Sequence, residues 1–67
     1  MAFYLKLIIE SKDEEDVVRI IESNDLAYTI RRLGMHCSMN IHGPRFLEGI
    51  HELITTELDE ANINYIT

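Results

Sequence analysis

The sequence predicts an α+β domain with the element order βαββαβ, and three observations support that fold class. Four segments alternate apolar and polar residues with the two-residue period of a strand that is buried on one side. Two further segments place apolar residues at helical spacing, which predicts helices with one buried face. The chain has 67 residues, too few to fill two hydrophobic cores, so residues 1–67 are expected to form a single domain.

The first strand and the first helix are expected over residues 2–10 and 12–24. The buried face of the strand is predicted to consist of Phe3, Leu5, Leu7 and Ile9. Ser11 and Glu14 have the spacing of a capping box, in which the two side chains accept backbone N–H groups, so a helix is expected to begin there. The apolar stripe of this helix comprises Val17, Val18, Ile20 and Ile21.

A hairpin is expected in the middle of the chain, with strands over residues 26–33 and 35–42. The preceding Asn24-Asp25 pair is suited to the left-handed conformation that ends a helix. Strict alternation across the second of these strands is the clearest strand signal in the sequence. Gly34 lies between the two strands and can supply the positive φ that a tight turn requires.

The second helix and the last strand are expected over residues 44–61 and 63–66. Pro44 is suited to the first position of a helix, because the N–H at that position has no partner within the helix. Asn62 is suited to its end. The apolar stripe is predicted to comprise Phe46, Leu47, Ile50, Leu53, Ile54, Leu58 and Ala61.

Two one-sided helices and four alternating strands together predict a ferredoxin-like architecture. This is a four-stranded antiparallel sheet with both helices on one face. Right-handed crossovers place the first and third strands at the centre of the sheet and the second and fourth at its edges. The opposite face of the sheet is then left open.

Acidic residues dominate the two expected helices. The chain has six Lys and Arg against twelve Asp and Glu, a formal net charge of −6. Residues 12–25 and 45–61 each carry a net charge of −4, whereas the remaining strands and turns carry +2. Direct binding to nucleic acid or to a membrane surface is not expected, because both are anionic. The sequence also lacks an apolar run of the ~20 residues that span a bilayer and the pattern of a signal peptide, so a cytoplasmic protein is expected.

The acidic helix surface has two interpretations. It is either a solvated helix face or a surface that imitates nucleic-acid phosphate and docks into the basic cleft of a protein partner. The expected partner-binding residues are Asp13, Glu14, Glu15, Asp16, Glu48, Glu52, Asp59 and Glu60.

The open sheet face also has two interpretations. A second copy of the chain can cover it, and a homodimer is the default expectation for a domain with so small a core. Alternatively, an anion or a peptide binds there. An RNA-binding sheet would need stacked aromatic residues on its central strands, which this sequence does not provide. The residues expected on the open face are Tyr4, Lys6, Arg31, His36, Ser38, Asn40 and His42.

No group of residues in the sequence predicts catalysis, a metal site or a cofactor, so the protein is not expected to be an enzyme. His36 and His42 are separated by roughly 20 Å along a strand and cannot bind one ion. Cys37 points to the opposite side and is expected to be a buried thiol. The segment His51-Glu52-Leu53-Ile54-Thr55 resembles a zinc-protease motif, except that Thr55 stands where the second histidine is needed.

Residues 39–66 resemble the second half of ACT regulatory domains. The resemblance rests on Met39-Asn40-Ile41-His42-Gly43-Pro44-Arg45-Phe46-Leu47, on the apolar stripe of the second helix, and on Ala61-Asn62-Ile63-Asn64-Tyr65-Ile66. ACT domains are βαββαβ modules that pair and bind amino acids at their interface, so the resemblance implies a homodimeric amino-acid sensor. The first half of the chain lacks the corresponding glycine turn. The ligand-contacting turn implied by the resemblance consists of His42, Gly43, Pro44 and Arg45.

The favoured functional hypothesis is a small stand-alone binding protein that regulates or inhibits a macromolecular partner by surface contact. A phage-type inhibitor of a nucleic-acid-handling protein fits this description, since the basic cleft of such a protein attracts an acidic surface. The ACT-like sensor is the alternative hypothesis.

Overall fold

The computed structural model describes residues 4–42 and 48–67, and for Glu48 it describes the backbone alone. The expectations for Phe3, for the helix start at Pro44, and for Phe46 and Leu47 lie outside the described residues. The elements are β1 (Leu5–Glu10), the 3-10 turn η1 (Ser11–Asp13), α1 (Glu14–Ser23), β2 (Ala27–Leu33), β3 (His36–His42), α2 (Glu48–Glu60) and β4 (Tyr65–Ile66).

The four strands form one antiparallel sheet in the order β2-β3-β1-β4. β1 and β3 are therefore central, and β2 and β4 lie at the edges, which confirms the predicted placement of the strands. β1 pairs with β3 along its whole length, from Leu5 opposite Ile41 to Glu10 opposite His36. β4 is two residues long and pairs with the last part of β1.

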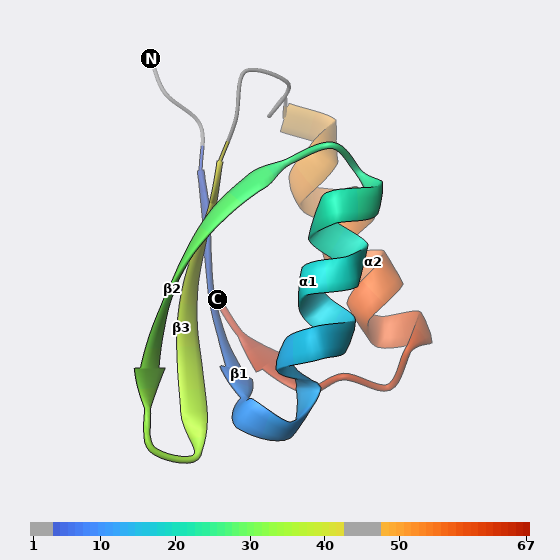
Figure 1. The fold of residues 1–67 in the computed structure, drawn as a ribbon. Coiled ribbons are helices and arrows are strands. Elements are labelled where there is room, and N and C mark those ends of the chain that lie inside the picture. Colours follow the sequence, from blue (N-terminus) through green and yellow to red (C-terminus); the bar gives the residue numbers. More distant parts are fainter. Residues whose placement is uncertain (1–3, 43–47) are drawn as a thin grey trace.

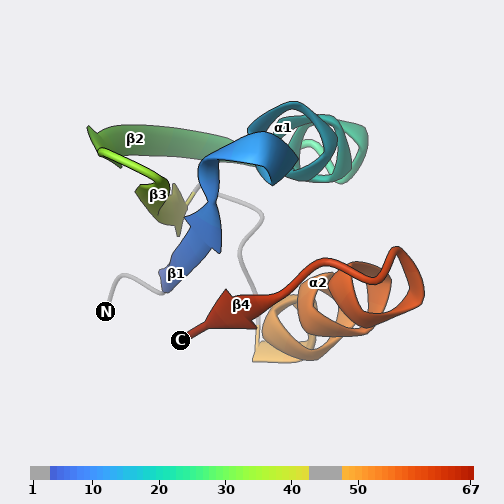
Figure 2. The same cartoon turned by 90° about the horizontal axis from the view of Figure 1, so that it is seen from below.

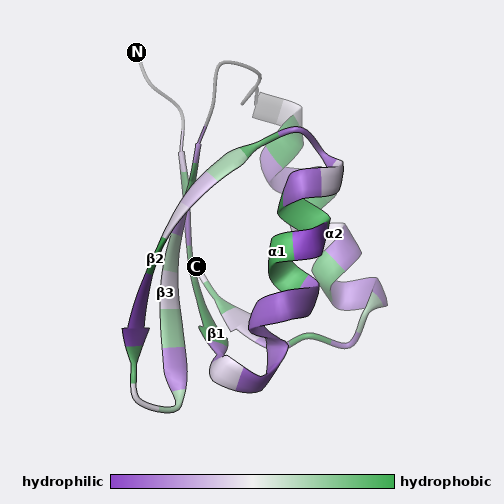
Figure 3. Ribbon diagram, viewed as in Figure 1, coloured by the Kyte–Doolittle hydropathy of each residue, from purple (hydrophilic) through white to green (hydrophobic). Residues whose placement is uncertain are grey.

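Both helices lie on the same side of the sheet (Figures 1 and 2). Hydrophobic and hydrophilic segments alternate along each helix (Figure 3), as expected of a helix that buries one face and exposes the other. The α+β class and the four-stranded antiparallel sheet are thus confirmed, and the second face of the sheet carries no helix within the described residues.

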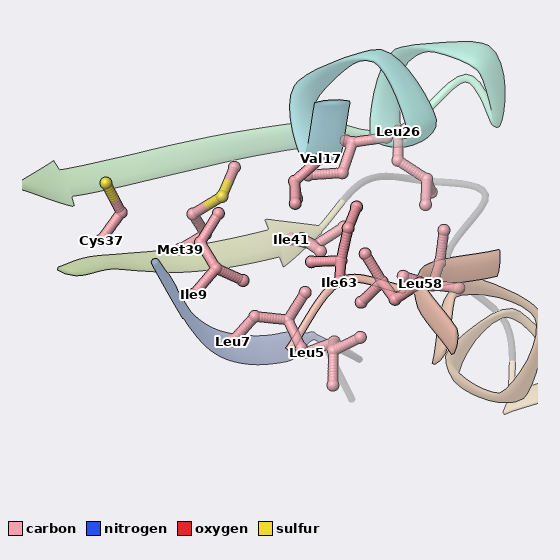
Figure 4. Packing of buried hydrophobic residues seen from close by; sticks show 12 residues of the cluster. Leu5, Leu7, Ile9, Val17, Leu26, Cys37, Met39, Ile41, Leu58 and Ile63 are labelled. Carbon is pink, nitrogen blue, oxygen red and sulfur yellow. The ribbon is translucent and has the colours of Figure 1, made fainter. Parts of the chain in front are cut away.

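The core lies between the sheet and the helices (Figure 4). Alternate residues of the central strands point into it, while α1 and α2 each contribute residues spaced by one helical turn. Burial of an aliphatic side chain of this size stabilises the fold by about 1.5–3 kcal/mol. The buried residues are Leu5, Leu7, Ile9, Val17, Ile21, Leu26, Cys37, Met39, Ile41, Ile54, Leu58 and Ile63.

Both helices end in the same backbone motif. At the end of α1, Asp25 has φ 60°, and the Leu26 N–H donates to the Ile21 carbonyl at 3.2 Å. At the end of α2, Asn62 has φ 58°, and the Ile63 N–H donates to the Leu58 carbonyl at 3.0 Å. Each is a Schellman motif, which satisfies the last helical carbonyls and turns an apolar residue back into the core.

The predicted turn conformations are confirmed at all three positions. Asp25 and Asn62 are the left-handed residues at the helix ends, and Gly34 has φ 68° between β2 and β3. Positive φ is strained for most residues with a Cβ atom, and Asp, Asn and Gly are the types that adopt it with least cost.

The predicted capping box at the start of α1 is wrong. The Ser11 hydroxyl donates to the Gly34 carbonyl at 3.0 Å, and the Glu14 carboxylate accepts two hydrogen bonds from Arg32. Asp13 occupies the N-cap position and makes no side-chain capping bond within the described residues. Both presumed capping groups thus contact β2 or the turn after it, and α1 begins three residues after Ser11.

The predicted apolar stripe of α2 requires two corrections. Ala61 is exposed and lies after the end of the helix at Glu60. Ile54 and Leu58 are fully buried, and Ile50 packs against the core, but the Leu53 side chain is 45% exposed. Residues four apart lie on one side of a helix, so the series that begins at Ile50 faces the sheet, while Leu53 lies at its margin.

Candidate functional site

Six of the seven residues that the sequence assigned to the open face lie in β1, β2 or β3, and Tyr4 precedes β1. Six of the seven are exposed and Ser38 is half-buried. The strand register places Ser38 between Ile8 of β1 and Arg31 of β2. His36 and His42 stand at the two ends of β3 and cannot act on one ligand atom. This face is therefore a mixed polar surface.

The end of the sheet that carries the β2–β3 turn is more apolar than the alternation alone suggested. The side chains of Met35 and Leu33 are 83% and 55% exposed. On the other side of β1, Ile66 is 66% exposed and lies opposite Ile8. These residues come from separate segments of the chain. Only the register in which the strands pair would have shown that they lie at the same end of the sheet.

A cavity of about 310 Å³, which we call the hairpin recess, lies between the β2–β3 turn and the start of η1. A smaller hollow of about 170 Å³ lies beside it near β4 and shares Glu10 and His36 with it. The hairpin recess is lined by Glu10, Ser11, Lys12, Gly34, Met35 and His36.

Hydrogen bonds fix the two segments that form the hairpin recess. The Ser11 N–H donates to the Met35 carbonyl at 2.8 Å, and the Ser11 hydroxyl donates to the Gly34 carbonyl at 3.0 Å. Both donor groups of Ser11 are therefore used within the fold. The β1–η1 turn and the β2–β3 turn are held together by these bonds, although they are far apart in the sequence.

Glu10 is the acidic group of the hairpin recess. Its Oε2 atom is shielded from solvent and has no hydrogen-bond partner within the described residues. The Lys12 ammonium lies 3.7 Å from this oxygen, which is an ion-pair distance but too long for a hydrogen bond. A shielded carboxylate oxygen of this kind retains unused capacity to accept a hydrogen bond.

Glu14, Arg32 and Cys37 form a polar cluster that contacts Ser11 through Cys37, and we call this cluster the Glu14 latch. Arg32 donates to the two carboxylate oxygens of Glu14 at 3.0 and 2.7 Å, a bidentate arrangement. The Cys37 thiol lies 3.5 Å from the Glu14 carboxylate and 3.6 Å from the Ser11 hydroxyl. Cys37 is buried, as predicted.

The Glu14 latch changes the acidity of its members. Hydrogen bonds from Arg32 hold the pKa of the Glu14 carboxyl below its ordinary value, with desolvation acting in the opposite direction and the Cys37 thiol adding to the lowering. The Glu14 carboxylate in turn raises the pKa of the Arg32 guanidinium. Glu14 is thus a structural carboxylate, and its charge is already balanced by Arg32.

The other predicted partner-binding residues differ in what they contact. Asp16 lies 3.6 Å from Arg19 of the same helix in a solvent-exposed ion pair. Asp13 is half-buried, and the side chain of Glu48 lies outside the described part of the structure. The members that are exposed and make no ion pair with another described residue are Glu15, Glu52, Asp59 and Glu60.

The turn implied by the ACT resemblance is represented by His42 alone, which is exposed at the end of β3. Gly43, Pro44 and Arg45 lie outside the described residues. Among residues 4–42 and 48–67, no group of three or more His, Cys, Asp or Glu side chains is placed to hold a metal ion. No helix in the same part of the chain is both long enough and apolar enough to cross a membrane.

Comparisons of the chain with protein-family models, with curated proteins and with solved structures gave no match.

Proposed function

We propose that the chain is a small acidic binding protein that regulates or inhibits a macromolecular partner by protein–protein contact. The observation that carries this proposal is the excess of carboxylates on α1 and α2, several of which are exposed and make no ion pair with a described residue. Such a surface accelerates encounter with a basic site and disfavours acidic ones.

The contacts of the acidic residues reduce the set of side chains that we propose for docking. Glu14 is excluded, because its carboxylate is engaged by Arg32 and Cys37. Glu15 on α1 and Glu52 on α2 are exposed, as are Asp59 and Glu60 at the end of α2. A basic partner that approaches the helix side meets these side chains without first breaking an internal salt bridge.

The partner class we propose is a protein that handles nucleic acid. The cleft of such a protein is basic because it must neutralise phosphates. Carboxylates spaced along two helices can occupy the same positive field, and the chain then acts as an inhibitor by competition. A phage-type inhibitor of a nucleic-acid-handling protein would act in this way.

We also infer that the fold is ferredoxin-like and that the open sheet face pairs with a second copy. The strand order, the antiparallel pairing and the single helix layer support the fold assignment. The half-buried Ile8 and the exposed Ile66 support pairing, since a second copy would remove their apolar surface from water.

Affinity capture at two salt concentrations tests the proposed function. The tagged chain is used to capture proteins from host lysate at low salt, and each captured protein is challenged with increasing salt. A partner held through the acidic helices is released as salt rises, because exposed charges are screened. Retention of every partner at high salt would contradict the proposal.

The amino-acid-sensing alternative predicts a different result in the same preparation. A bound amino acid raises the melting temperature by mass action, and this rise persists at high salt. Thermal scans with individual amino acids therefore separate the two functions.

A further inference from the structure

We propose that the hairpin recess binds an arginine side chain of the protein partner. The inference rests on the proposed function for the source of the arginine, because a basic cleft is rich in this residue. It concerns a different surface from the acidic helices, namely the recess formed by Glu10, Ser11, Lys12, Gly34, Met35 and His36.

The backbone carbonyls of the recess and the carboxylate of Glu10 favour a ligand that donates hydrogen bonds. Ser11 uses its N–H and its hydroxyl proton on the carbonyls of Met35 and Gly34, so neither donor remains for a ligand. Those carbonyls retain a second lone pair, and the Glu10 carboxylate adds further acceptors. A turn that precedes a helix often binds anions through free N–H groups, but here the N–H of Ser11 is occupied and a carboxylate lies beside it.

Glu10 is the group that selects for a cation. Its Oε2 atom lacks a hydrogen-bond partner among the described residues, and the Lys12 ammonium at 3.7 Å is a loose, intramolecular counter-ion. The Lys12 side chain is 75% exposed, so it can leave the carboxylate at little cost in packing. Rotation about the terminal bond of a glutamate is soft, and it presents either oxygen to a ligand. A guanidinium can then replace the ammonium with two parallel hydrogen bonds.

Met35 supplies the apolar part of the same site. It lines the recess and is 83% exposed. An arginine side chain combines a hydrocarbon stem with a planar cationic head, and methionine is an adaptable surface for such a stem. The cavity volume of about 310 Å³ is at the lower end of the range for small-ligand sites, which suits one side chain.

The test uses amide NMR spectra of the full chain during titration with Nα-acetyl-arginine methylamide. The neutral isostere Nα-acetyl-citrulline methylamide is the matched ligand control. We expect saturable shifts for the amides of residues 10–12 and 34–36 with the arginine probe, and an affinity at least about tenfold lower for citrulline, because hydrogen bonds to a charged group are the strong ones.

Two pairs of variants separate the recess from general attraction to an acidic protein. Glu10→Gln is expected to weaken the arginine probe by at least about tenfold, whereas Glu15→Gln, with the same charge change on α1, alters affinity by less than about twofold. Lys12→Ala is expected to strengthen binding because it removes the competing ammonium, and Lys6→Ala is its control. Circular dichroism verifies that each variant is folded.

Three outcomes would overturn the inference. These are equal affinity for arginine and citrulline, shifts spread over the acidic helices, and equal effects of Glu10→Gln and Glu15→Gln. Any of them leaves the salt-dependent docking of the acidic helices intact, because that docking is measured with the captured partner. Loss of salt dependence in capture, with arginine binding retained, would instead remove the proposed function and leave the recess as a cation site.

Discussion

Glu14 connects three parts of the chain through one carboxylate. It lies at the first position of α1, accepts two hydrogen bonds from Arg32 of β2, and contacts the thiol of Cys37 on β3. Its neighbour Ser11 holds the β2–β3 turn through Gly34. The start of α1 is therefore fixed by tertiary contacts, which take the place of a local cap.

The Glu14 latch predicts a loss of stability in acid. The pKa of Glu14 in the folded chain is below the ordinary value of 4.5, so its contribution is fully present above that pH. As the pH falls from that value through the lower folded pKa, the carboxylate is protonated and this contribution is lost. Urea unfolding of wild type at pH values on both sides of this window measures the effect.

The variant Glu14→Gln is the test of this assignment, and Glu15→Gln is its control. Glu14→Gln should lower the free energy of unfolding at neutral pH and should make it less sensitive to acid. Glu15 is exposed, so its replacement should change neither quantity appreciably. Equal pH dependence in Glu14→Gln and wild type would show that the latch does not contribute to stability.

Asn62 gives a second prediction at the residue scale. Its φ of 58° ends α2, and an alanine there must carry a Cβ in the left-handed region. Asn62→Ala is expected to destabilise the fold by about 1 kcal/mol, while Asn62→Gly is expected to be neutral or stabilising, because glycine adopts this conformation without strain. Chemical denaturation measures the free energy of unfolding of the two variants. Equal destabilisation by both would contradict the role that we assign to the backbone conformation of Asn62.

At the scale of elements, the apolar residues of α2 differ in how deeply they are buried. Leu58 is fully buried against the sheet, whereas Leu53 is 45% exposed at the margin of the contact. Leu58→Ala is expected to lower the free energy of unfolding by about 2–5 kcal/mol, because it leaves a cavity in the core. Leu53→Ala makes the same chemical change and is expected to cost less than about 1 kcal/mol. Similar losses in thermal or urea unfolding would mean that the helix is rotated from the orientation described.

Periodicity predicted most of the elements because β1, β3 and both helices each bury one face. The alternation of β3 identified Cys37, Met39 and Ile41 as core residues, and all three are buried. The left-handed residues at both helix ends were also predictable, since few residue types tolerate that conformation. The order of the strands followed from the handedness of crossovers.

Features that depend on distant residues could not be read from local spacing. Ser11 and Glu14 match a capping box, but their partners lie 23 and 18 residues away, on Gly34 and Arg32. The hairpin recess depends in the same way on the β1–β3 register, which places Glu10 opposite His36. A local pattern cannot choose between a nearby backbone N–H and a stronger charged partner that the fold brings close.

At the scale of the whole molecule, charge is divided between two faces. Residues 12–25 and 45–61, which include the two helices, each carry a net charge of −4, whereas the rest of the chain carries +2. The helices lie on one side of the sheet, so the acidic surface and the open sheet face point in different directions (Figure 2). The proposed partner and the proposed second copy would therefore occupy different surfaces.

The proposed pairing through the sheet predicts that a charge at its centre dissociates the dimer. Ser38 is half-buried between Ile8 and Arg31. Ser38→Glu should shift the mass measured by light scattering toward that of one chain, 7.8 kDa, because the added carboxylate would have to be desolvated at the interface. Thr56→Glu adds the same charge on exposed α2 and should leave the mass unchanged. A wild-type mass of 7.8 kDa at high micromolar concentration would contradict pairing outright.

The association rate of a captured partner, measured against salt for two charge-matched variants, tests the central claim most directly. The pair Glu15→Gln/Glu52→Gln and the pair Asn64→Lys/Thr67→Lys raise the net charge by the same amount, the first on the helices and the second at exposed residues on either side of β4. Docking through the acidic helices predicts that the wild-type rate falls about tenfold or more as salt rises, and that the first pair alone slows association at low salt. Equal rates for the two pairs, or a wild-type rate independent of salt, would contradict the claim that the acidic helices are the docking surface.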